Sequence, residues 1–71
     1  MMQFGDGLRT MRAWRRMSQV ELEQITGIST VYLSAYENGK SLPGANAKQA
    51  IRQALGWEAH HDAGLKILAG G

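Results

Sequence analysis

Apolar residues recur at the spacing of one helix face in the second half of the chain. Within residues 45–55 they fall at positions i, i+3, i+4, i+7 and i+8: Ala47, Ala50, Ile51, Ala54 and Leu55. Polar residues fill the opposite side, and Gly56 follows as a residue suited to end a helix. The pattern predicts an amphipathic helix over residues 45–55 that turns one face to a core.

A second apolar stripe at helical spacing lies near the N-terminus: Leu8, Met11 and Trp14. Asp6 or Gly7 can cap the N-terminal end of this segment, which is predicted to be helical to about Arg16. The larger aromatic side chains are expected in the core: Trp14, Tyr36 and Trp57.

Two shorter segments between these helices carry their own start and stop signals. Ser18 followed by Glu21 forms a capping box, and the helix that it begins is predicted to stop at Gly27. Ser29 can cap the next helix, which is predicted to stop at residues 38–39, Asn-Gly. So short a connection, closed by a glycine, makes the two helices cross steeply and predicts a helix-turn-helix.

The tail from Glu58 has too few apolar residues to fix a period: Leu65, Ile67 and Leu68. Three conformations stay open for residues 58–71, namely a short fifth helix, an extended dimer arm, or partial disorder. The predicted fold class is therefore all-α, a small bundle of four to five helices with the helix-turn-helix at its centre.

Length and composition restrict what this bundle can do. A chain of 71 residues forms one domain and buries only about 60% of the surface that its unfolded form exposes, which leaves no room for an enzyme cleft plus a second domain. The net charge of +2 permits a polyanionic partner. Cysteine is absent, and neither a signal-peptide pattern nor a membrane-spanning apolar run is present. We expect a soluble, cytoplasmic protein.

Enzyme, metal and cofactor chemistry find no support in the residue pattern. The run His60-His61-Asp62 could resemble metal ligands, but adjacent helix residues diverge and no distant second histidine or cysteine completes a shell. It is interpreted as solvated surface. Neither a positioned nucleophile nor a Gly-rich phosphate loop is present, so we expect no cofactor and no small-molecule ligand.

The third predicted helix, about residues 29–37, has one side free of charge. On a helical wheel, Leu33 and Tyr36 face the core with Glu37 beside them. The opposite side carries small or neutral residues: Val31, Ser34 and Ala35, with Thr30 and Tyr32 at its edges. Because a solvated helix face usually carries charge, this side is expected to be covered, either by a DNA major groove or by a fifth helix or partner subunit.

The order and spacing of the motifs then favour DNA as the partner that covers this side of the helix. Over residues 8–57 the chain resembles the Cro/CI-type (XRE-like) helix-turn-helix family of phage repressors and bacterial regulators, whose DNA-binding domains have the lambda-repressor-like fold. The resemblance rests on the following stretches: Ser18-Gln19, Gly27-Ile28-Ser29, Glu37-Asn38-Gly39-Lys40 and Pro43. It implies a sequence-specific transcriptional regulator that binds double-stranded DNA, with residues 58–71 as a possible dimerisation segment.

Particular residues take family roles through this resemblance. It implies DNA contacts at these positions: Gln19, Ser29, Thr30, Val31, Tyr32, Ser34, Ala35, Asn38 and Lys40. Within this set, Gln19 clamps a phosphate, Tyr32 reaches the backbone, and Asn38 and Lys40 approach the sugar-phosphate chain. The resemblance also implies a structural ion pair between Arg12 and Glu37 rather than a DNA contact from either.

Two departures from the family pattern bear on function. Glu23 stands where the family prefers alanine, so either the two central helices lie farther apart or the Glu23 side chain leans outward into a salt bridge. The base-facing positions lack the Gln, Asn or Arg that make bidentate base contacts, so we expect weak direct readout and a larger contribution from DNA shape.

Two functional hypotheses follow. The first is a homodimeric DNA-binding regulator, with the dimer formed through the apolar tail residues and the exposed side of the fourth helix or Trp57. The second is a protein-interaction module, such as an antirepressor or adaptor, that uses the neutral third helix to bind protein.

Overall fold

The computed structural model describes residues 3–70, and describes the side chains of residues 3–65. It contains five α-helices: α1 (Phe4–Trp14), α2 (Gln19–Thr26), α3 (Thr30–Glu37), α4 (Ala45–Leu55) and α5 (Ala59–Gly70). No strand occurs among the described residues, so the all-α prediction is confirmed. In this part of the chain no helix is long and apolar enough to cross a bilayer.

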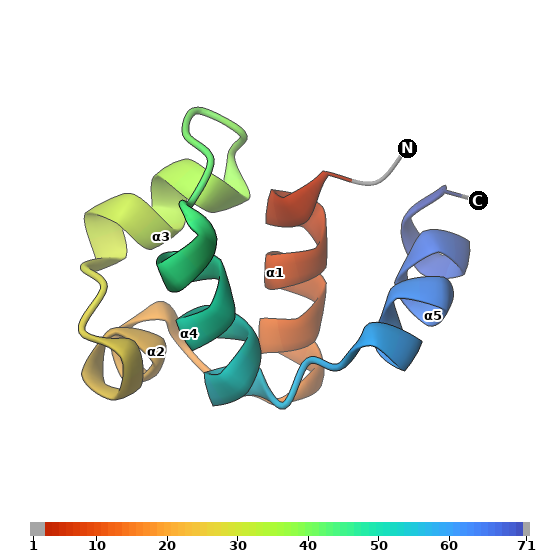
Figure 1. Ribbon diagram of the computed structural model, residues 1–71, viewed down its shortest axis with the longest axis horizontal. Coiled ribbons are helices and arrows are strands. Elements are labelled where there is room, and N and C mark those ends of the chain that lie inside the picture. The colour runs from red at the N-terminus through yellow and green to blue at the C-terminus, as the bar shows by residue number, and fades with distance from the viewer. Residues whose placement is uncertain (1–2, 71) are drawn as a thin grey trace.

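Helix α1 is the centre of the arrangement. It packs against α3 and α4 on one side and against α5 on the other, while α2 contacts α3 and α4 (Figure 1). The buried core draws on every helix and on the segment between α4 and α5: Leu8, Met11, Leu22, Leu33, Ile51, Leu55, Trp57 and Leu65. A single core therefore holds the α2–α3 pair against the rest of the domain.

The predicted ends of the middle helices are confirmed. The hydroxyl of Ser18 accepts the Glu21 N–H at 3.0 Å, and the Glu21 carboxylate accepts the Ser18 N–H at 3.1 Å. Gly27 ends α2 with a φ of +76°, in the left-handed region that favours glycine. Helix α4 spans the predicted residues 45–55 and ends at Gly56 in the same conformation.

Helix α1 begins earlier than the capping pattern predicts. Its N-cap is Gln3, and Asp6 and Gly7 lie inside the helix rather than before it. The additional turn lies close to α3, since a Cβ on Gly5 would overlap the carbonyl oxygen of Tyr36 and lie 2.9 Å from that of Glu37. Glycine allows the first turn of α1 to abut the last turn of α3.

The aromatic residues are only partly where the sequence predicts them. Trp57 is buried and Tyr36 packs partly buried against the core. The expectation for Trp14 is wrong, since its side chain is 61% exposed at the C-terminal end of α1. Its indole instead meets the edge of His61 at a centroid distance of 5.4 Å and lies under the Arg15 guanidinium.

Of the three conformations open for the tail, the structure adopts the fifth helix. Leu65 is 3% exposed because α5 packs on α1, and Trp57 is 4% exposed. Neither side chain is available to a partner subunit, so the expectation that they form a dimer interface is wrong. Ile67 and Leu68 lie outside the described side chains.

The close approach of α1 and α3 gives a matched pair of glycine substitutions. Gly5→Ala places a methyl group against backbone carbonyls and should lower the free energy of unfolding by about 1–3 kcal/mol, the usual cost of overpacking. Gly64→Ala, in α5 with open space around its Cβ position, should instead raise it by about 0.5–1 kcal/mol. Urea denaturation of both variants measures the difference. Equal stabilities would contradict the close contact.

Candidate nucleic-acid interface

The turn between α2 and α3 is fixed by side chains from both sides. The Thr26 hydroxyl donates to the Leu22 carbonyl at 2.8 Å and accepts the Ile28 N–H at 3.1 Å. After the turn, the Ser29 hydroxyl accepts the Tyr32 N–H at 3.4 Å and caps α3. These bonds set the direction in which α3 leaves the turn.

Helix α3 has the two sides that the wheel predicts. Leu33 is fully buried, and Glu37, one turn further on, is 7% exposed. On the other side Val31 is 76% and Tyr32 59% exposed, while the remaining predicted base-facing residues are half-buried: Thr30, Ser34 and Ala35. The outward side presents short, uncharged side chains and one tyrosine.

Polar residues occur before and after this surface in the chain. Gln19 is the first residue of α2 and is half-buried, while Asn38 and Lys40 are exposed after α3. The Asn38 amide donates to the Ser34 hydroxyl at 3.4 Å, and Gly39 takes a φ of +72°, so the left-handed residue of the predicted Asn-Gly stop is the glycine. The Lys40 N–H donates to the Ala35 carbonyl at 2.9 Å, so the turn closes the end of α3 and leaves the Lys40 side chain exposed.

A buried ion pair ties the far end of α3 to α1. Arg12 Nε donates to Glu37 Oε2 at 2.8 Å and Arg12 Nη2 donates to Oε1 at 3.1 Å, so the pair implied by the resemblance is present and bidentate. Arg12 also donates to the carbonyl of Met17 at 3.0 Å. This salt bridge joins α1, the α1–α2 connection and the last turn of α3.

Sequence reasoning missed a second arginine at the same carboxylate. Arg9 Nη2 donates to the backbone carbonyl of Glu37 at 2.7 Å, and Arg9 Nε lies 4.0 Å from its carboxylate. Arg9 and Arg12 are three positions apart on α1 and so share one helix face. This spacing could have predicted that Arg9 also contacts Glu37. Together they satisfy both the side chain and the C-terminal carbonyl of α3.

The pair also fixes the ionisation of Arg12. The hydrogen bonds and charge of Glu37 raise the pKa of the Arg12 guanidinium above its usual value, although burial acts against this. A raised pKa on a cation adds stability below the ordinary pKa, which is lost only when the pH exceeds the folded value. Arg12 is therefore charged, and its contribution constant, throughout the neutral pH range.

Glu23 follows neither expectation drawn from the sequence. Its half-buried carboxylate accepts the Thr30 N–H at 3.3 Å, and α2 and α3 remain in contact. The side chain thus turns toward the N-terminal end of α3 instead of leaning outward or holding the helices apart. The first N–H of α3 lacks an intrahelical partner, and Glu23 supplies one.

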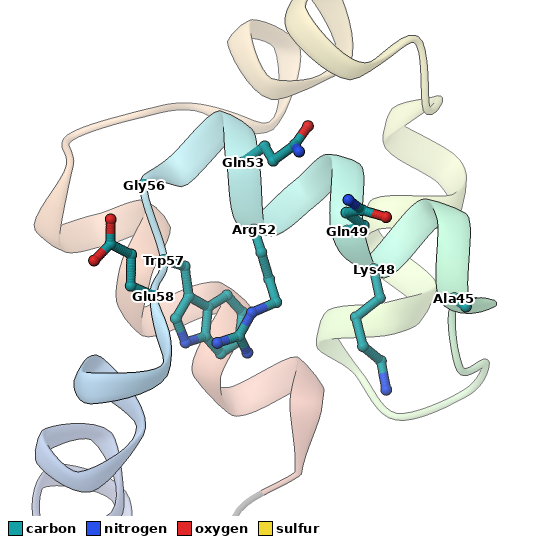
Figure 2. Close-up of a pocket in the computed structure, with 8 residues that line it drawn as sticks. All are labelled: Ala45, Lys48, Gln49, Arg52, Gln53, Gly56, Trp57 and Glu58. Carbon is teal, nitrogen blue, oxygen red and sulfur yellow. The ribbon is translucent and has the colours of Figure 1, made fainter.

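Other cations of the domain are engaged in packing. Arg15 donates to the carbonyl of Leu55 at 2.8 Å at the end of α4. Figure 2 shows Arg52 lying across the indole of Trp57 on the outer face of α4. The guanidinium carbon is 4.6 Å from the ring centroid, and both residues line a hollow of about 720 Å³. Arg52 also pairs with Asp62 at 3.4 Å, so this hollow is not a free basic pocket.

The histidine run is solvated surface only in part: His60 is exposed as predicted, whereas His61 and Asp62 are half-buried and bonded within the fold. His61 Nδ1 accepts the Glu58 N–H at 2.9 Å at the start of α5, and Asp62 accepts the Trp57 indole N–H at 2.8 Å. Among the described residues no three His, Cys, Asp or Glu side chains are gathered for a metal ion.

Comparison with known families agrees with this geometry. A family model described as a helix-turn-helix domain matches residues 3–61, from the N-cap of α1 into the first turn of α5. The chain belongs to this helix-turn-helix family, and its motif supports a DNA-binding regulator. No curated protein and no solved structure matches the chain. The protein-interaction alternative receives no support from the family.

Removal of one partner from the Arg12–Glu37 pair should be costly. Glu37→Gln leaves the Arg12 charge without its carboxylate in a site where Glu37 is nearly buried, and should lower the free energy of unfolding by about 3–5 kcal/mol. Arg9→Ala removes a cation that is 54% exposed and should cost about 1 kcal/mol or less. Urea denaturation of both variants tests this, and equal losses would show that the buried pair has no special role.

Proposed function

We propose that the protein is a sequence-specific transcriptional regulator that binds double-stranded DNA with α3 in the major groove. The observation that carries the proposal is the exposed, uncharged outer side of α3 in a helix-turn-helix whose ends bear polar groups. A major groove admits a helix, and short side chains allow the helix backbone to approach the base edges closely.

The contacts divide into base and backbone readout. Thr30, Val31, Ser34 and Ala35 face the bases, where hydroxyls bond to base edges and methyl groups touch thymine methyls. The phosphates are held by the groups around them: Gln19, Ser29, Tyr32, Asn38 and Lys40. Ser29 suits this role because its oxygen already accepts the Tyr32 N–H, which leaves its hydroxyl proton to donate to a phosphate.

The protein is further proposed to act as a homodimer in the cytoplasm, without catalytic activity, on two half-sites about one helical turn apart. Because Leu65 and Trp57 are buried within the monomer, the interface must use other residues. The C-terminal part of residues 58–71 is the proposed contact region.

Selection from a random duplex library tests the proposal directly. The protein should enrich a palindromic site with half-site centres about 10 base pairs apart. Selections at low and moderate salt should yield the same site, because base contacts and DNA shape do not depend on counterion release. Absence of enrichment at both salt concentrations would refute the regulator.

Substitution of two proposed phosphate-binding residues, Gln19 and Lys40, should then show whether their positions or only the net charge of the protein governs DNA binding. Gln19→Ala with Lys40→Ala should weaken binding of the selected site by about tenfold or more per lost phosphate contact, since hydrogen bonds to charged groups carry about 1.5–3 kcal/mol. Loss of the Lys40 cation from both protomers of the dimer should also reduce the slope of log K against log salt by about 1.8, or about 0.9 per protomer.

A matched control lies on the outer face of α4. Gln53→Ala with Lys48→Ala removes one amide and one ammonium from exposed residues that line the hollow in Figure 2, away from α3. This variant should bind DNA nearly as the parent does. Equal losses in the two double variants would mean that net charge alone, not the positions of Gln19 and Lys40, governs binding.

A further inference from the structure

The N-terminal end of α3 holds a negative charge that α3 itself does not supply. The first turn of α3 contains no acidic residue. Instead Glu23, which belongs to α2, brings its carboxylate to 3.3 Å from the Thr30 N–H. The Ser29 hydroxyl accepts the Tyr32 N–H in the same turn. Two of the N–H groups that lack intrahelical partners are therefore bound, one of them by an ion.

This placement matters because a helix N-terminus attracts anions. The aligned peptide dipoles leave a partial positive charge there, and the free N–H groups point toward an incoming phosphate. A carboxylate bound at Thr30 takes up that position and adds a full negative charge. The backbone N–H groups at this end of the helix then oppose a phosphate instead of binding one, and a phosphate contact there is left to the Ser29 hydroxyl.

A neutral side chain would suffice if Glu23 served only as a cap. The Ser29 hydroxyl performs that task for Tyr32 within the same turn. What Glu23 adds beyond a hydrogen bond is charge, close to the residues that face DNA in the proposed function, and the chain has only a small positive excess of +2.

We propose that Glu23 is a specificity-determining residue: its carboxylate at the Thr30 N–H excludes phosphate from the backbone N–H groups in the first turn of α3 and so weakens binding to unselected DNA. Binding to unselected DNA draws almost all its free energy from phosphates, and it can use an anion site in any register. In the selected complex the base contacts hold the DNA in one register, with its phosphates at the proposed side-chain contacts, so the exclusion of phosphate from these N–H groups costs it less. The inference rests on the proposed function.

The test compares Glu23→Gln with Glu58→Gln. Both variants raise the net charge by one, but the Glu58 side chain is 73% exposed before α5, whereas the Glu23 side chain binds α3. Glutamine keeps an oxygen that accepts the Thr30 N–H. At low salt Glu23→Gln should bind an unselected duplex about two- to fivefold tighter, the range expected for one charge at a helix end. Glu58→Gln should change it less, and the selectivity ratio should fall only for Glu23→Gln.

A second variant, Glu23→Ala, and a measurement made without DNA distinguish failure of the inference from failure of the proposed function. Glu23→Ala removes both acceptor and charge, so it should tighten binding to the unselected duplex and also speed hydrogen exchange at the Thr30 amide. If the parent binds the selected site but both Glu23 variants bind unselected DNA no tighter than Glu58→Gln does, the inference is overturned and the regulator stands. If neither the parent nor any variant binds any duplex, both the inference about Glu23 and the proposed function are refuted.

Discussion

The carboxylate of Glu37 is the group on which the arrangement depends. It sits in the last turn of α3, nearly buried, and two arginines of α1 converge on it and on its backbone carbonyl. Burying one charge without a partner would be prohibitive, so the position of α3 depends above all on the Arg12 guanidinium that α1 presents to Glu37. The glycine contact at Gly5 brings the two backbones close at the same place. The direction of α3, and with it the surface that faces outward, follows from this junction.

The sequence predicted those parts of the fold that depend on local chemistry. The capping box at Ser18, the left-handed Gly27 and the stripe of α4 are decided by neighbours within a few residues, and each is confirmed. The early start of α1 could not be predicted, because it depends on the α3 backbone that faces Gly5. The position of Trp14 was predicted wrongly for a related reason. It is at helical spacing from Met11, yet α1 ends at that position and the ring extends beyond the core.

In the candidate site, too, features decided by neighbours in the sequence were predicted, and features decided by tertiary contacts were not. Periodicity assigned Leu33 to the core and Val31 to the outside, and the structure places both as predicted. The resemblance supplied the partner of Arg12, because a pair separated by 25 residues leaves no local signal. Neither route predicted Glu23, since the family pattern identified it only as a departure from alanine. Its orientation depends on a free N–H that exists only once α3 has been placed after the turn.

Several arginines affect function because their contacts within the domain keep them from neutralising DNA phosphates. Arg9, Arg12, Arg15 and Arg52 all bind carbonyls or carboxylates of the domain itself, so these four of the eight basic residues are committed to the fold. With α3 in the groove as proposed, few cations remain to neutralise phosphates, and Glu23 opposes one more. Affinity for unselected DNA is then low from the outset. Against so weak a background, modest contacts from Thr30, Val31, Ser34 and Ala35 suffice to choose a site, because selectivity is a ratio of two affinities.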